Sequence, residues 1–342
     1  MDWFERLTHF RESTYAETQA RLSAVDGRLS VNGTDWSYGV GRLTLPSLSE
    51  LRIEANRVHR AGRSRLSIVQ GDVRALHGHE GNQGALFQVA SQFNMLEMVG
   101  PDVTPEDGVT RYAYDRTQGP ACAIAAGAAT IYRNYFAPVA DGIGQTADRQ
   151  LDGLADLGRE LAQRLNWIVE DLWRMQNGYA LPTESGLAAL SDLLETLDED
   201  ERDALRGLMQ FGLHQDVEVT DGPLPGQTVS QIFCSALPVA YCRLPKAHWT
   251  SFARLVLEAA YEATLLAGVL NAERGASDRI LLTRLGGGAF GNADEWIDDA
   301  LVRAVRIVGE RDLDIVVVSY GLPTQHFTQQ LARTGLLKTP PS

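Results

Sequence analysis

Residues 281–292 read Leu-Leu-Thr-Arg-Leu-Gly-Gly-Gly-Ala-Phe-Gly-Asn, an apolar run that ends in a glycine-rich loop just before a helix-like stretch. Glycine has no Cβ, so its backbone can adopt positive φ values and bring its N–H groups close to an anion. The start of the following helix adds the positive end of a helix dipole. The stretch therefore predicts a strand, a phosphate-binding loop and a helix, with the candidate binding residues Gly286, Gly287, Gly288 and Gly291.

Strand and helix patterns alternate on the N-terminal and C-terminal sides of this loop. Residues 65–70 and 84–91 are short apolar runs typical of strands, and polar residues follow each of them. Residues 249–270 and 295–307 have helical periodicity, and residues 313–319 are apolar enough for a central strand. In open α/β sheets, ligands bind at the carboxyl ends of the strands. The pattern predicts an α/β fold with its binding site at that edge of the sheet.

Two segments depart from this alternation. Residues 1–64 predict an N-terminal extension of helices and a hairpin around Asn32-Gly33, so that the core would occupy residues 65–330. Residues 145–211 predict a helical insertion into that core. Leucines spaced by three and four residues indicate one long amphipathic helix between Leu151 and Met175. We expect the insertion to be available for contacts with another protein.

The overall composition excludes several classes of protein. The chain has 342 residues, 44% of them hydrophobic, which is enough to bury a large core. Its formal net charge of −13 disfavours binding of duplex nucleic acid through a broad basic face. We find no apolar stretch of membrane-spanning length and no signal-peptide pattern at the N-terminus. We therefore expect a cytoplasmic protein that does not enter a membrane.

The sequence predicts neither a metal nor another resident cofactor. The cysteines, Cys122, Cys234 and Cys242, have no metal-type spacing, and their odd number does not indicate a disulfide framework. His77-Gly78-His79-Glu80 contains good zinc ligands. However, two histidines one residue apart cannot easily reach one ion from a regular helix, and no second cluster is evident.

Residues 286–291 also satisfy the dinucleotide-binding motif G-x-G-x-x-G literally. A dinucleotide-binding unit would carry this motif in its first strand-to-helix turn and an acidic residue at the end of the next strand. Here the next strand ends at Ser319-Tyr320-Gly321 and only about fifty residues follow the motif. A nucleotide-cofactor oxidoreductase is therefore retained as an alternative only.

The order of the segments resembles the macrodomain family over about residues 65–320. The resemblance rests on Gly71-Asp72-Val73 after the first strand, on Asn94 after the next, on the small residues from Gly119 to Gly127, and on the loop at Gly287 to Gly291. It implies a three-layer α/β/α fold with a mixed sheet. It also implies binding of ADP-ribose or a related nucleotide diphosphate sugar.

The same resemblance implies roles for individual residues. Asp72 would hold the adenine amino group, and Asn94 would contact the distal ribose. The segments from Gly119 to Gly127 and from Gly286 to Gly291 would clasp the diphosphate, with Phe290 against a sugar or base. The implied binding residues are Asp72, Asn94, Gly119, Gly127, Gly286, Gly287, Gly288, Phe290, Gly291 and Asn292.

Residues 11–18, Arg-Glu-Ser-Thr-Tyr-Ala-Glu-Thr, are similar to the lead-in of microbial poly(ADP-ribose) glycohydrolases, a branch of the macrodomains. This similarity implies an ADP-ribosyl hydrolase, and a non-catalytic ADP-ribose reader or sensor is the alternative. Asn94 is the first candidate catalytic residue, because it would fix the ribose while a carboxylate orients a water toward the anomeric carbon. The candidate partners between Asn94 and Gly119 are Asp102, Glu106, Asp107, Asp115 and Arg116.

Overall fold

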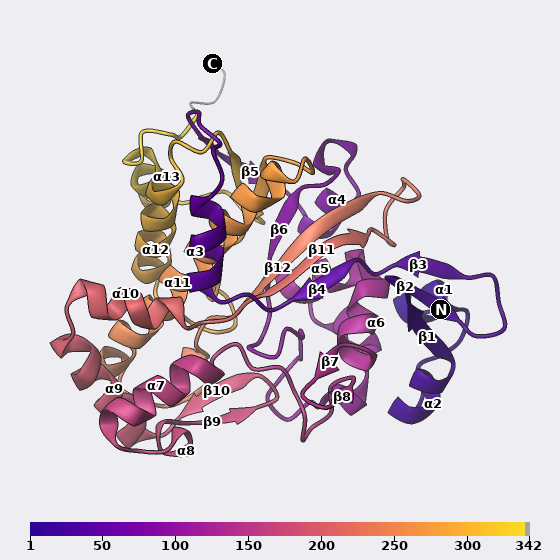
Figure 1. Ribbon diagram of the computed structural model, residues 1–342, viewed down its shortest axis with the longest axis horizontal. Helices are drawn as coiled ribbons and strands as arrows, with labels where there is room; N and C mark the ends of the chain where they lie inside the picture. The colour runs from indigo at the N-terminus through magenta and orange to yellow at the C-terminus, as the bar shows by residue number, and fades with distance from the viewer. Residues whose placement is uncertain (339–342) are drawn as a thin grey trace.

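The computed structural model describes residues 1–338 and is built around a seven-stranded sheet with the strand order β4-β11-β12-β6-β13-β14-β5 (Figure 1). Its strands are β4 (Arg42–Thr44), β5 (Arg65–Gln70), β6 (Leu86–Ala90), β11 (Gly212–Glu218), β12 (Thr228–Cys234), β13 (Arg279–Leu282) and β14 (Asp314–Ser319). Strands β12, β6, β13, β14 and β5 are parallel, and β11 is antiparallel to both of its neighbours. The predicted α/β class with a mixed sheet is confirmed.

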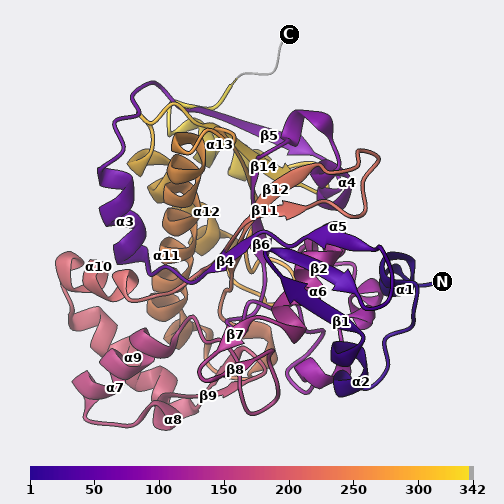
Figure 2. The ribbon, with the colours of Figure 1, turned by 45° about the vertical axis from the view of Figure 1, so that its right-hand side comes forward.

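Helices cover both faces of this sheet and make a three-layer structure (Figure 2). One face carries α3 (Leu48–Asn56), α11 (Lys246–Glu273) and α12 (Asp294–Ile307), with α13 (Gln325–Ala332) packed on α12. The other face carries α4 (Val73–His77), α5 (Gln118–Ala125) and α6 (Gly127–Tyr135). Strand residues alternate between the two cores: Ile315 and Val317 pack on the first face, and Val316 on the second.

Helix α11 is the central helix of the first layer. By length and composition it could cross a membrane, which the sequence-based expectation overlooked, but 83% of its most apolar window is buried within the fold. It packs against β6, β12 and β13 on one side and against α3 and α12 on the other. Its apolar residues therefore serve the protein core.

The N-terminal segment does not stand apart from the sheet. It consists of α1 (Trp3–Thr8), α2 (Tyr15–Ala20) and the three-stranded sheet of β1 (Leu22–Val25), β2 (Arg28–Val31) and β3 (Ser37–Gly39), followed by the edge strand β4 of the main sheet. The predicted hairpin around Asn32-Gly33 joins β2 to β3. The Glu12 carboxylate accepts hydrogen bonds from the amides of Val109 and Thr110, so the extension anchors the segment that leads into α5.

Residues 145–211 are only partly helical. They contain α7 (Ala155–Leu165), α8 (Val169–Leu172), the hairpin of β9 (Trp173–Gln176) and β10 (Tyr179–Pro182), α9 (Glu184–Thr196) and α10 (Glu199–Gly207), and a small hairpin of β7 (Pro138–Val139) and β8 (Gly142–Ile143) precedes them. The prediction of one helix from Leu151 to Met175 is wrong. Asn166 ends α7 in the left-handed conformation with φ 56°, and Asn177 and Gly178 turn the β9–β10 hairpin with φ 47° and 79°. This hairpin delivers Tyr179 to the site described next.

Candidate active site

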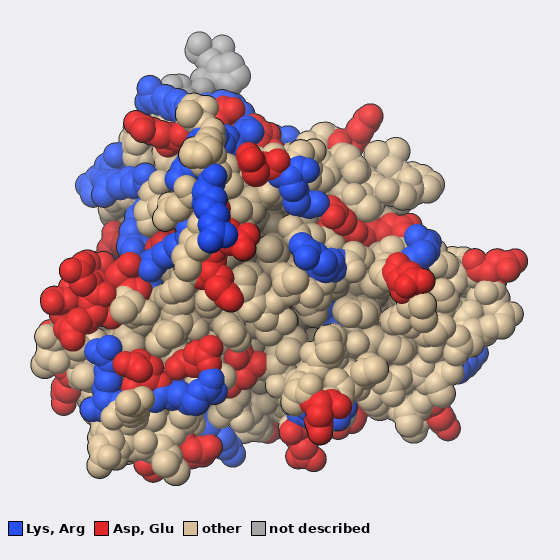
Figure 3. Space-filling view, in the orientation of Figure 1, with Lys and Arg blue, Asp and Glu red and all other residues tan. Residues whose placement is uncertain are grey.

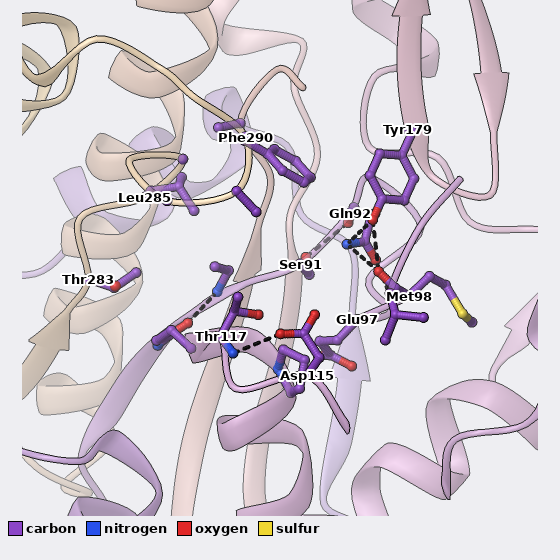
Figure 4. A pocket seen from close by; sticks show the side chains of 18 of the residues that line it. Ser91, Gln92, Glu97, Met98, Asp115, Thr117, Tyr179, Thr283, Leu285 and Phe290 are labelled. Carbon is purple, nitrogen blue, oxygen red and sulfur yellow. Dashed lines mark hydrogen bonds between the residues drawn. The ribbon is translucent and has the colours of Figure 1, made fainter. Parts of the chain in front are cut away.

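A cavity of about 160 Å³ opens at the carboxyl ends of the parallel strands β6, β12 and β13 (Figure 4). Its walls come from segments far apart in the sequence: residues 90–92 and 97–99 after β6, four residues around the start of α5 (Asp115, Thr117, Gln118 and Pro120), Tyr179 of β10, and residues 283–286 and 288–290 after β13. Ala236 and Tyr241, which follow β12, complete the lining. The sheet edge that the sequence predicts for ligand binding therefore carries this cavity.

The glycine loop after β13 lines the cavity, and several of its backbone amides have no acceptor within residues 1–338. Gly286 and Gly291 have φ values of 76° and 71°, and the loop is closed by a 3.0 Å hydrogen bond from the Asn292 amide to the Gly286 carbonyl. The Asn292 side chain donates to the Leu237 carbonyl at 2.8 Å, which fastens the loop to the segment after β12. Four residues of the loop line the cavity and have backbone amides that donate no hydrogen bond to any of residues 1–338: Gly286, Gly288, Ala289 and Phe290.

The opposite wall contains the N-terminus of α5. The Gln118 side chain forms two hydrogen bonds with β6. It accepts from the Ala90 amide at 2.8 Å and donates to the Gln88 carbonyl. The amides of Gln118 and Gly119 donate to no other described residue, and Pro120 has no N–H. Of these residues Gln118 lines the cavity, so its unpaired amide and the positive end of the α5 dipole belong to this second wall.

Glu97 is a buried acid in the wall of this cavity. Its side chain has 0% exposure, and its Oε1 lies 3.1 Å from Nη2 of Arg133. Burial raises the pKa of Glu97 to about 7, and the charge of Arg133 opposes this shift. A carboxyl group with a pKa near neutrality suits general acid catalysis, because it is partly protonated at pH 7 and transfers its proton readily.

Arg133 holds the Glu97 carboxylate without lining the cavity itself. Its Nε donates to the Met95 carbonyl at 3.1 Å, and its guanidinium lies 3.9 Å from the centre of the Phe233 ring. The amide of Glu97 donates to the Tyr112 hydroxyl at 3.2 Å. Tyr112 therefore holds the backbone of Glu97, and Arg133 holds its carboxylate.

Three aromatic rings form the apolar wall of the cavity. Tyr179, Tyr241 and Phe290 have ring centroids 5.3 to 5.6 Å apart. The Tyr179 hydroxyl donates to the Met98 carbonyl at 2.8 Å, next to Glu97. Such a wall can cover the apolar face of a sugar ring while the polar residues contact its hydroxyl groups.

The structure brings only part of the predicted binding set to the cavity. Gly286, Gly288 and Phe290 line it. The other predicted loop residues, Gly287, Gly291 and Asn292, belong to the loop but do not line the cavity. Asn94 does not line it, so a direct contact of this side chain with the ribose stays a prediction. Its Nδ2 donates to Gln150 at 2.8 Å, and its Oδ1 accepts the Leu96 amide at 3.1 Å. Asn94 thus shapes the turn that carries Glu97.

Asp72, Gly119 and Gly127 also lie outside the cavity lining. Asp72 follows β5 at the edge of the sheet and caps α4 by accepting the Arg74 amide at 2.9 Å. Gly127 lets α6 approach α1, since an added Cβ would lie 2.9 Å from the Trp3 ring. Gly119 lets α5 approach β6, because an added Cβ would overlap the Ala90 carbonyl oxygen. Both glycines serve packing at these positions.

Of the carboxylates considered from the sequence, only Asp115 lines the cavity. Asp102 accepts from Gln176, Glu106 from the Ala147 amide, and Asp107 from the Thr104 amide at the start of a 3-10 turn. Sequence reasoning missed Glu97 and Tyr179. Glu97 stands alone among Met95, Leu96, Met98 and Val99, and an acid inside an apolar run is a signal that could have identified it.

No group of three or more His, Cys, Asp or Glu side chains within residues 1–338 could hold a metal ion. His77 is fully buried, with its Nδ1 2.7 Å from the Val73 carbonyl, and burial lowers its pKa to about 4. The His79 ring instead accepts the Gly81 amide at the start of a short 3-10 turn. The two histidines therefore have separate structural partners.

Comparisons with known proteins identify structural neighbours only. No protein-family model and no curated protein sequence matches the chain. The chain is similar in structure to poly(ADP-ribose) glycohydrolase from Thermomonospora curvata bound to the inhibitor ADP-HPD, with 12% identity, coverage of 93% of this chain and 97% of that chain, and a TM-score of 0.44. It is also similar to the enzyme from Deinococcus radiodurans in complex with ADP-ribose, with 11% identity, 85% and 93% coverage, and a TM-score of 0.44.

We expect Gly119→Ala to destabilise the protein by roughly 1–3 kcal/mol, the usual cost of overpacking a filled site. The added methyl group would overlap the Ala90 carbonyl oxygen, so α5 would have to move away from β6. Urea denaturation measures the change. Gly100→Ala is the matched control, because a Cβ there meets no atom within 4 Å. Equal midpoints for the two variants would contradict the close approach of α5 to the sheet.

Proposed function

We propose that this protein binds ADP-ribose at the carboxyl edge of its sheet and hydrolyses the glycosidic bond at the terminal ribose, with Glu97 as the general acid. The observation that carries the proposal is that residues of the glycine loop and Gln118 of α5, whose amides have no acceptor, line one cavity together with the buried acid Glu97.

A pyrophosphate is the ligand group that suits these amides best. It carries two negative charges and many acceptor oxygens, which backbone N–H groups can satisfy without a cationic side chain. The cation at the cavity, Arg284, is already paired with Asp294 at 2.7 Å and with Asp298 at 2.6 Å. Acidic and basic side chains are interspersed over the face seen in Figure 3, without a broad basic area that would attract long polyanions.

The rest of ADP-ribose can follow the edge of the sheet. In this arrangement the terminal ribose lies between Glu97 and the ring of Phe290, and the pyrophosphate crosses the end of β13. The adenine then reaches the ends of β14 and β5, which are paired from Asp314 with Arg65 to Ser319 with Gln70. Asp72 and the 89% exposed ring of Tyr320 are available there to accept from the adenine amino group and to stack on the base. Asp72 thus keeps its predicted role.

The chemistry follows from the protonation state of Glu97. The protonated carboxyl gives its proton to the oxygen that leaves the anomeric carbon as the glycosidic bond breaks. A water then adds to the anomeric carbon and returns a proton to the Glu97 carboxylate. Asp115, which lines the same cavity, can orient that water. Asn94 acts through the turn that positions Glu97.

Calorimetric titration with ADP-ribose, ADP and NAD tests the binding proposal. We expect ADP-ribose to bind best and ADP to bind on the order of tenfold more weakly, because ADP cannot place a second ribose in the cavity. A preference for NAD would instead support a nucleotide-cofactor oxidoreductase. Binding of ADP-ribose without release from any ADP-ribosylated substrate would indicate a reader. On its composition we also propose a cytoplasmic location.

A further inference from the structure

We propose that a groove beside the cavity holds the leaving group of this reaction, and that this group is the terminal nucleotide of a single-stranded nucleic acid. The groove is lined by Val99, Arg111, Tyr114, Asp115 and Arg116, and we call it the acceptor groove. The inference rests on the proposed hydrolysis of an ADP-ribosyl bond, since it assigns the other side of that bond.

The acceptor groove is continuous with the cavity. Val99 and Asp115 line both of them. Val99 lies two residues after Glu97, and Asp115 accepts the Thr117 amide at 2.8 Å at the entrance to α5. A group attached to the terminal ribose would therefore leave the cavity past these two residues and enter the groove.

Tyr114 offers an exposed ring on a well-anchored segment. The residue is 84% exposed and lies at the end of a 3-10 helix that spans Thr110–Tyr114. The Thr110 amide donates to the Glu12 carboxylate, and the Trp3 indole donates to the Thr110 carbonyl. Tyr112 of the same helix is buried in the core with 1% exposure. An exposed aromatic ring on an anchored segment is a feature on which nucleic-acid bases stack in single-stranded complexes.

The charges in the acceptor groove match one phosphate. Arg116 is exposed and has no hydrogen bond or ion pair with any of residues 1–338. Arg111 is already paired with Asp107 at 3.4 Å, and the Asp115 carboxylate lies at the boundary with the cavity. The single unpaired guanidinium suits the one charge of a nucleotide linkage better than the two charges of a pyrophosphate. The net charge of −13 further limits contact to the strand end.

The test compares Tyr114→Ala and Arg116→Ala with the wild-type protein on three substrates: ADP-ribose linked to the 5′-phosphate of a short single-stranded oligonucleotide, to a glutamate peptide, and in poly(ADP-ribose). Each variant should raise KM on the oligonucleotide on the order of tenfold, the effect of losing one base stack or one phosphate contact. Neither should change KM on the peptide or the affinity for free ADP-ribose. Trp167→Ala and Arg57→Ala, which remove a ring and an exposed arginine elsewhere, are the matched controls.

A second readout does not require turnover. Fluorescence anisotropy of a labelled, 5′-phosphorylated oligonucleotide, with ADP-ribose saturating the cavity, should show binding that Tyr114→Ala and Arg116→Ala weaken by a similar factor. Losses confined to poly(ADP-ribose), equal losses on peptide and oligonucleotide, or no loss on any substrate would each overturn the inference. Failure of the wild-type protein to bind ADP-ribose would contradict the proposed function, whereas normal ADP-ribose binding with unselective variants would contradict the groove assignment alone.

Discussion

We expect Glu97→Gln to lower the rate of ADP-ribosyl hydrolysis by about 10²- to 10⁴-fold, the usual contribution of a positioned general acid. Glutamine keeps the size of the side chain and an acceptor oxygen for Arg133, but it has no acidic proton to give to the leaving oxygen. The calorimetric affinity for ADP-ribose should change little, because the proposed phosphate contacts come from the glycine loop and α5. Single-turnover release of ADP-ribose measures the effect.

The pH profile gives an independent check of the same assignment. The raised pKa of about 7 means that Glu97 is mostly protonated below pH 7 and mostly ionised above it. The wild-type rate should therefore fall as pH rises through about 7, and the variant should lack this limb. Asp115→Asn is the matched comparison and should lose less than tenfold. If Asp115→Asn lost more activity than Glu97→Gln, the acid would have to be reassigned, and a thermal melt would show whether each variant is folded.

Gly288→Val should weaken ADP-ribose binding by roughly 100-fold or more, because loss of a charge-assisted hydrogen bond and a steric clash both act against the pyrophosphate. A Cβ built at Gly288 meets no atom within 4 Å, and the residue lines the cavity, so the valine side chain occupies free space beside the ligand amides. The fold itself should tolerate the change. Calorimetric titration with ADP-ribose measures it.

Gly287→Ala is the control within the same loop. A Cβ there lies 3.2 Å from Cδ1 of Ile297, and Gly287 does not line the cavity. This variant should keep its ADP-ribose affinity within about threefold, since it disturbs only an apolar contact behind the loop. Unchanged affinity in Gly288→Val would remove the glycine loop from the proposed phosphate site.

The two glycine segments show how far local sequence predicts function. The loop at Gly286 to Gly291 follows an apolar strand and precedes a helix, so its conformation is encoded locally, and Gly286 and Gly288 line the cavity. The small residues from Gly119 to Gly127 have a similar composition. However, their glycines meet Ala90 and Trp3, contacts that depend on distant segments, and only the beginning of α5 faces the cavity.

The sequence by itself determined the α/β class, the positions of the parallel strands β5, β6, β13 and β14, and the glycine loop, because hydrophobic periodicity and glycine conformation act over a few residues. Only the tertiary structure decided which side chains meet at the cavity. The Asn94 side chain bonds to Gln150 and to the Leu96 amide. Glu97 is buried beside Arg133, and this burial raises its pKa. Tyr179 contacts Phe290 from the β9–β10 hairpin, in a region that the helical spacing of leucines did not predict to contain strands. Desolvation and cross-chain packing are set by neighbours far away in sequence, so a local pattern can mark an unusual residue such as Glu97 but cannot show which side chains it meets.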